Sequence, residues 1–176
     1  MKHLTDEELM SRVAGGELDS MRLLFDRYHA WIFNFFLQKL RNRELSEDLT
    51  QNTFYKVLKN RSSYNGGRFV SWIFQIARNL GNDHFRQAKN LQATTALEEV
   101  EELADIPDTG EQVAILQLAM QQLGEADREL LILSRFKGMK YAQIAAITGL
   151  SEAAVRIKAH RAIKKLRTLY FQTAEV

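Results

Sequence analysis

The chain has 176 residues, a net charge of +2 and a hydrophobic fraction of 45%, values that fit one or two compact globular domains. It has no cysteine, and its four histidines lie far apart in sequence, so we expect no disulfide, no metal site and no cofactor. No window approaches the roughly 20 apolar residues of a membrane span, and the N-terminus has acids where a signal peptide is apolar, which predicts a cytoplasmic protein without membrane insertion.

Helical periodicity dominates the N-terminal half. A long helix with one apolar face is predicted from the three- and four-residue steps between Met21, Leu24, Phe25, Tyr28, Ile32, Phe35 and Phe36. A second helix is predicted over Asp48–Leu58, with Ser46 as its N-cap. The run SSYNGGR at 62–68 favours a break, because Asn and paired Gly are turn residues, and an amphipathic helix is predicted from Phe69 to Leu80.

An acid-free stretch covers residues 49–82, between Asp48 and Asp83. It holds five cations and six aromatic residues, namely Lys56, Lys59, Arg61, Arg68, Arg78, Phe54, Tyr55, Tyr64, Phe69, Trp72 and Phe74. Cations attract phosphates, and flat rings stack on unpaired bases. The pattern predicts a surface for opened or single-stranded nucleic acid that repels phosphates nowhere, although rings that only form a hydrophobic core would give the same pattern.

An acidic segment follows at residues 91–111. It has seven acids and no lysine or arginine, a net charge of −7, which leaves +9 on the rest of the chain. The only proline, Pro107, lies in it, and the apolar periodicity weakens. We interpret it as a linker between two helical domains at 1–90 and 112–176. No segment shows sustained strand alternation, so the predicted fold class is all-α.

The C-terminal domain has the pattern of a helix-turn-helix. A short helix is predicted over Tyr141–Thr148, a tight turn at Gly149-Leu150, and a last helix from the N-cap Ser151 to about Leu169. With Val155 in the core and about 100° per residue, the outward face carries Ala153, Ile157, His160, Arg161 and Lys164, flanked by Arg156 and Lys158. Such a face is expected to contact DNA bases and phosphates, although a solvated basic helix would show the same charges.

Taken together, these residues resemble bacterial RNA polymerase sigma factors of the extracytoplasmic-function group of the sigma-70 family. The resemblance covers about Met21 to Leu169. It rests on DLTQNTFYKV at 48–57, SSYNGGRFVSWIFQIARN at 62–79 and YAQIAAITGLSEAAVRIKAHRAIKKLR at 141–167. It implies sigma region 2 at 1–90, and sigma region 4 with its helix-turn-helix at 112–176.

The resemblance also implies residue roles. It assigns core polymerase binding to Asp48, Gln51 and Phe54. It assigns −10 promoter DNA and its melting to Tyr64, Asn65, Arg68, Trp72, Asn79, Asp83 and Arg86, with Tyr64–Arg68 as the loop that captures a flipped base. It assigns the −35 element to Tyr141, Ser151, Ala153, Ala154, Arg156, Ile157, Lys158, His160, Arg161 and Lys164. Three departures are Leu123-Gly124, where relatives commonly have Leu-Pro, Ala153-Ala154, where they often have Gly-Thr, and Ile157, at a position that is usually small and polar.

The function implied by the resemblance is that of a non-enzymatic factor. It would direct core RNA polymerase to specific promoters and assist their melting, with an anti-sigma factor as a further partner. The alternative interpretation is a helix-turn-helix transcriptional regulator that binds duplex DNA without polymerase, which leaves the acid-free stretch without a role. An enzyme is not expected, because the sequence has no glycine-rich phosphate loop, metal-ligand spacing or nucleophile motif.

Overall fold

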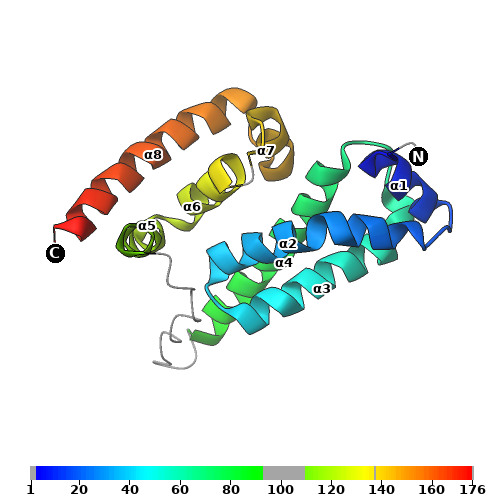
Figure 1. Ribbon diagram of the computed structural model, residues 1–176, viewed down its shortest axis with the longest axis horizontal. Helices are drawn as coiled ribbons and strands as arrows, with labels where there is room; N and C mark the ends of the chain where they lie inside the picture. The colour runs from blue at the N-terminus through cyan, green and yellow to red at the C-terminus, as the bar shows by residue number, and fades with distance from the viewer. Residues whose placement is uncertain (1–2, 93–109, 137, 176) are drawn as a thin grey trace. The chain divides into compact units, whose positions relative to one another are not determined.

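The computed structural model describes residues 3–92, 110–136 and 138–175, and the chain divides into two compact units, residues 1–102 and 103–176 (Figure 1). All regular secondary structure in these described ranges is helical, which confirms the all-α prediction. Most of the predicted acidic linker lies outside the described residues. The flanking helices take in its ends, since one extends through Gln92 and the next begins at Glu111.

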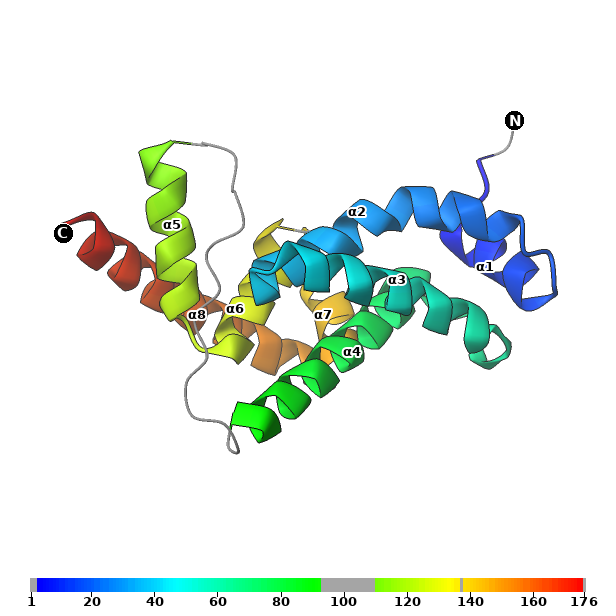
Figure 2. The ribbon, with the colours of Figure 1, turned by 90° about the horizontal axis from the view of Figure 1, so that it is seen from below.

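Unit 1 is a helical bundle. Its elements are α1 (Asp6–Ala14), α2 (Ser20–Leu40), α3 (Arg43–Lys59), the 3-10 helix η1 (Arg61–Ser63) and α4 (Phe69–Gln92). Helices α2, α3 and α4 lie lengthwise against one another, and α1 packs on α2, on η1 and on the first part of α4 (Figure 2). The break predicted at 62–68 and the helix predicted from Phe69 are confirmed.

The core of unit 1 is aromatic and aliphatic. Its fully buried side chains include Leu24, Ile32, Phe35 and Phe36 of α2 and Phe69, Ile73 and Phe74 of α4. One member of the predicted apolar face of α2 departs from this arrangement. Phe25 is 40% exposed, and its ring stacks on His29 of its own helix at 4.9 Å between centroids, so this member of the predicted apolar face is not buried.

The start of α3 also differs from the prediction. Asn42 is the N-cap, and its side chain accepts a hydrogen bond from the Leu45 N–H at 2.9 Å. The predicted N-cap, Ser46, is fully buried inside the helix, and its hydroxyl donates to the Asn42 carbonyl at 2.6 Å. Both residue types are good N-caps, and the earlier one satisfies the exposed N–H groups first, so the helix begins at Arg43 rather than at Asp48.

Unit 2 carries the helix-turn-helix. Its elements are α5 (Glu111–Gln122), α6 (Glu125–Leu131), the π-helical turn η2 (Ile132–Phe136), α7 (Tyr141–Thr148) and α8 (Glu152–Ala174). Gly149 ends α7 with a φ of 75°, a left-handed conformation that glycine adopts without strain. Ser151 caps α8 by accepting from the Ala154 N–H at 3.1 Å. The predicted helix, turn and N-cap are confirmed, and α8 runs on past Leu169 to Ala174.

The connection between α5 and α6 is held by an arginine. Arg128 donates from Nη2 to the carbonyls of Gln121 at 3.2 Å and Leu123 at 3.1 Å, and burial lowers the pKa of its guanidinium. Leu123 and Gly124 have extended backbones, with φ, ψ of −67°, 147° and −57°, 150°. The glycine therefore keeps the backbone conformation that a proline at this position requires.

Gly124→Pro is expected to raise the free energy of unfolding of unit 2 by about 0.4–1 kcal/mol, because it restricts the unfolded chain without straining the folded one. The φ of Gly124 suits proline, the ψ of Leu123 suits the residue before a proline, and a Cβ at 124 would meet no atom within 4 Å. Urea unfolding of the full chain measures the change. Gly149→Pro is the control and should destabilise, since its φ is positive; a destabilising Gly124→Pro would contradict the argument.

Candidate nucleic-acid interface

The loop Tyr64–Arg68 is closed by its own hydrogen bonds. The Tyr64 hydroxyl donates to the Gly67 carbonyl, and the Gly67 N–H donates to the Asn65 side-chain oxygen at 3.4 Å. Gly66 has a φ of 82°, which favours glycine at the tip of the turn. Burial, and after it the carboxylates of Glu7 and Asp6, raise the pKa of Tyr64 above its ordinary value of 10.0, so the hydroxyl remains a donor at neutral pH.

The rings of the acid-free stretch divide into core and surface. Phe54, Phe69 and Phe74 are buried, Tyr64 and Trp72 are half-buried, and Tyr55 is 63% exposed. The Tyr64 and Trp72 rings lie 5.3 Å apart between centroids, and both lie near Phe69, at 6.5 and 6.3 Å. The hydrophobic core thus accounts for three of the rings, while Tyr64 and Trp72 form a partly open aromatic pair at the loop.

One face of α4 continues from this pair. Trp72, Asn79, Asp83 and Arg86 are spaced by seven, four and three residues, which places them along one side of a helix. Asn79, Asp83 and Arg86 are exposed, and Arg86 Nη2 pairs with Asp83 Oδ1 at 2.8 Å. Asn65 and Arg68 of the loop are exposed as well. The structure therefore places the residues assigned to −10 DNA on the loop Tyr64–Arg68 and along one side of α4 in unit 1.

The acids of α1 correct the expectation that this surface repels phosphates nowhere. Glu7 Oε1 accepts a hydrogen bond from the Phe69 N–H at 3.2 Å, a contact between residues 62 positions apart. Asp6 accepts from the Tyr28 hydroxyl and from Arg27 Nη1. Two carboxylates thus lie beside an acid-free part of the sequence, and no local pattern could have revealed them.

The three residues assigned to polymerase binding lie on α3 with different exposures. Asp48 and Gln51 are exposed one turn apart, whereas Phe54 is only 6% exposed, with its ring 4.8 Å from that of Phe25. Sequence reasoning missed Phe25 as a surface ring here, because it fits the apolar period of α2. The aromatic surface beside Asp48 and Gln51 is therefore supplied by Phe25 and Tyr55 rather than by the face of Phe54.

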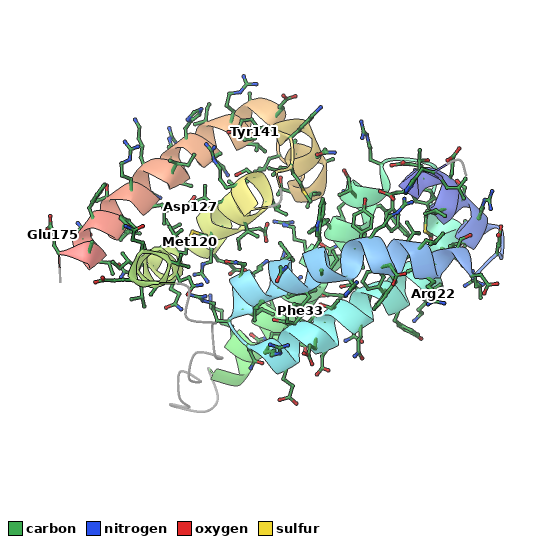
Figure 3. All side chains as sticks on the ribbon, viewed as in Figure 1. Arg22, Phe33, Met120, Asp127, Tyr141 and Glu175 are labelled. Carbon is green, nitrogen blue, oxygen red and sulfur yellow. The ribbon has the colours of Figure 1, made fainter. Side chains whose placement is uncertain are left out.

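The two faces of α8 separate as predicted. Val155, Ala159 and Ala162 are fully buried. The exposed residues of the helix include Ala153, Arg156, Ile157, Lys158, His160, Arg161 and Lys164. Figure 3 shows nitrogen-tipped side chains along the side of α8 that faces away from α6. Ile157, an apolar residue that is 52% exposed among cations, has the character of a base-contacting side chain.

The remaining residues assigned to the −35 element lie at the edges of this face. Tyr141 begins α7 and is half-buried, and Ala154 is half-buried in the first turn of α8. Ser151 uses its hydroxyl to cap α8. Arg156 lies 3.7 Å from Glu152, the one acid in the first turn of the helix. The face is basic overall, with both side chains of this pair exposed.

Across residues 3–92, 110–136 and 138–175, no three His, Asp or Glu side chains are grouped so that they could hold a metal ion. Within the same ranges, no helix combines the length and the apolar character needed to span a bilayer.

An aromatic pair on a helical bundle, together with a helix-turn-helix that has a basic outer face, is typical of a DNA-binding protein. Residues 24–91 match the Sigma-70 region 2 family, and residues 114–166 match the Sigma-70, region 4 family. The chain belongs to the sigma-70 family of RNA polymerase sigma factors, in its extracytoplasmic-function (ECF) group.

Individual relatives are similar over most of their length. The chain is 35% identical to the RNA polymerase sigma factor CarQ of Myxococcus xanthus, over 91% of this chain and 94% of CarQ. It is 28% identical to the ECF RNA polymerase sigma factor SigM of Bacillus subtilis, over 84% and 93%. The sigma factor RpoE of Bartonella quintana, solved with the anti-sigma factor NepR, shares the fold with a TM-score of 0.74 at 21% identity, over 84% and 94%. These relationships do not favour the alternative of a regulator that binds duplex DNA without polymerase.

Proposed function

We propose that this sigma factor divides promoter recognition between its two units. Unit 1 binds core RNA polymerase through α3 and opens the −10 element with the loop Tyr64–Arg68 and α4, while unit 2 binds the −35 element with α8. The observation that carries the proposal is the partly open pair of Tyr64 and Trp72 rings at the start of α4, with exposed Asn79 and Arg86 farther along the same side of the helix. The polymerase, in the cytoplasm, performs the chemistry, and this chain supplies promoter choice.

The aromatic pair suits the energetics of promoter melting. Extruding a base from a duplex costs a few kcal/mol, and stacking on an aromatic ring returns about 1–3 kcal/mol per base. Tyr64 and Trp72 offer partly open rings, and Arg68 and Arg86 offer cations for the backbone of the displaced strand. The stacking contacts exist only with the open strand, so they stabilise the melted promoter over the duplex.

The outer face of α8 suits a major groove. Arg156 and Arg161 are long enough to donate to guanine edges or to phosphates, and Ile157 can contact a thymine methyl. Lys158, at one flank, and Lys164, on the outward face, suit phosphates. Ala153-Ala154 lacks the hydroxyl that a Gly-Thr pair would bring, so the N-terminal end of the helix recognises DNA by shape and by its N–H groups.

An anti-sigma factor is proposed as a further partner. The surface of unit 1 carries exposed apolar side chains on α2 and α3, among them Leu23, Phe25, Trp31 and Tyr55. Exposed apolar side chains of this kind mark protein-binding surfaces. The related fold of RpoE, solved with its anti-sigma factor, supports a partner that covers such side chains and keeps polymerase away.

The test of the proposal is run-off transcription by bacterial core polymerase with and without this protein, on pooled genomic fragments of its source. We expect discrete transcripts that depend on the protein. If transcripts are absent while the protein alone binds duplex DNA specifically, the division of labour proposed here is wrong.

Asp48→Arg is expected to weaken core polymerase binding by about tenfold. It replaces a negative side chain with a positive one, and a polymerase surface that accepts a carboxylate would repel the positive charge. Asp48 is exposed, so the substitution should leave the folded state intact. Binding is measured by titrating core polymerase with labelled protein. The matched control is Asp19→Arg, an exposed acid whose side chain makes no capping hydrogen bond. Equal binding by wild type and Asp48→Arg would remove Asp48 from the interface.

A further inference from the structure

The residue at the N-cap position of helix α4 has a side chain that cannot cap the helix. The Trp72 N–H donates to the Arg68 carbonyl at 3.2 Å, which makes Arg68 the N-cap position. An arginine side chain has no hydrogen-bond acceptor, so it cannot receive the exposed N–H groups of the first turn. The acceptor comes from α1, since Glu7 Oε1 takes the N–H of Phe69 at 3.2 Å. A carboxylate at this end of a helix is also favoured by the helix dipole.

A second contact joins α1 to the same residue of α4. Asp6 accepts from the Tyr28 hydroxyl, and the Tyr28 ring packs edge-on against the Phe69 ring at 5.2 Å between centroids. Arg27 pairs with Asp6 from the neighbouring position on α2. Glu7 therefore holds the backbone of Phe69, while Asp6 holds the ring that packs on it.

The geometry of α1 is itself well fixed. Thr5 and Glu8 form a capping box, with the Glu8 side chain accepting from the Thr5 N–H at 2.8 Å and the Thr5 hydroxyl accepting from the Glu8 N–H at 3.2 Å. Leu9, Met10 and Val13 are fully buried beneath the helix. Glu7 thus projects from a rigid support.

Helix α1 also faces the loop. An open hollow of about 350 Å³ is lined by Leu4, Glu7, Glu8, Ser11 and Arg12 from the α1 side and by Gly66 from the loop. The carboxylate of Glu7 contributes to the raised pKa of Tyr64, which places its charge close to the aromatic pair. Glu7 therefore lies on the side of α1 that faces the side chains proposed to receive the melted strand.

We infer that Glu7 is a positioning residue for promoter opening: by capping α4 it fixes the first turn of that helix, and with it the directions of the Tyr64–Arg68 loop and of Trp72. The inference rests on the proposed function, which assigns that loop and Trp72 to −10 DNA. Glu7 touches neither the polymerase-binding residues nor DNA in this assignment. Its loss is expected to affect opening without affecting polymerase binding.

The test compares Glu7→Ala with Glu7→Gln in the reconstituted holoenzyme. The glutamine keeps an oxygen acceptor and removes only the charge. A promoter recovered by run-off transcription, labelled with 2-aminopurine in the −10 non-template strand, reports opening by its fluorescence, and core polymerase titration reports binding. We expect Glu7→Ala to lower the open fraction about fivefold, as loss of one helix cap would, with core binding within about twofold of wild type. Glu7→Gln should restore opening to within about twofold.

The outcomes separate this inference from the proposed function. Trp72→Ala is measured alongside. If it opens the promoter like wild type, the −10 assignment fails and the role of Glu7 falls with it. If Trp72→Ala is impaired and Glu7→Ala is not, only the role of Glu7 is overturned. The positioning role would also be overturned if Glu7→Ala lost opening and core binding equally. It would be overturned as well if Glu7→Gln lost as much of the open fraction as Glu7→Ala.

Discussion

Phe69→Ala is expected to lower the free energy of unfolding of unit 1 by about 3–5 kcal/mol, the range for deleting a fully buried phenylalanine ring. The Phe69 ring has no solvent exposure and lies against the rings of Tyr28, Tyr64 and Trp72. Its removal leaves a cavity at the point where α1, α2 and the start of α4 meet. Relaxation of the loop can fill part of that cavity, so the loss falls toward the lower end of the range if the loop moves.

Urea unfolding of the full chain, followed by circular dichroism, measures this loss. Tyr55→Ala is the matched control, because Tyr55 is an aromatic residue of the same stretch that is 63% exposed. Its effect should stay within about 0.5 kcal/mol. A Phe69→Ala protein that loses less than about 1 kcal/mol would show that the aromatic cluster is not a structural core.

Replacing Arg156, Arg161 and Lys164 together with glutamine is expected to weaken binding to promoter DNA by about 10²–10³-fold at roughly 0.1 M salt. All three are exposed on the outer face of α8. Each phosphate contact releases about 0.9 counterions, so the slope of log K against log salt should become less steep by about 2.7. If one of the arginines contacts a guanine edge rather than a phosphate, the slope changes less and the sequence preference relaxes at that base pair.

Holoenzyme binding to a promoter fragment across a salt series measures both the affinity and the slope. Lys165→Gln serves as the control on the same helix, because Lys165 Nζ is already paired with Asp127 at 3.0 Å. It should leave the slope nearly unchanged. A triple variant with the slope of wild type would mean that α8 meets DNA through another face.

The two units differ in how far their sites could be predicted from sequence. In unit 2 every signal is local: a glycine with positive φ, a serine cap, and a helix on which Val155, Ala159 and Ala162 alternate with outward cations. Such features depend on residues within a turn or two of each other, so periodicity and cap chemistry are enough to predict them from the sequence.

In unit 1 the decisive contacts join distant parts of the chain. Asn42 and Ser46 fit the N-cap rule equally well, and only the structure shows that Asn42 caps the helix while Ser46 lies inside it. Phe25 has the spacing of a core residue, and only the structure shows that its ring stays partly exposed beside Phe54 of α3. The hydrogen bond from the Phe69 N–H to the Glu7 carboxylate joins residues 62 positions apart, and no pattern of charges along the chain predicts it.

The separation of faces on α8 has a consequence for divergence within this family. The buried residues that support the helix and the exposed residues that we propose to meet DNA are disjoint sets, so mutation can exchange Ile157, His160 or Arg161 without a loss of folding. The DNA preference that we propose for α8 can therefore change without a cost in stability. In unit 1, by contrast, Phe69 and Trp72 sit in one cluster that serves both core and loop. Selection for stability constrains that unit, so its preference should change more slowly than that of α8.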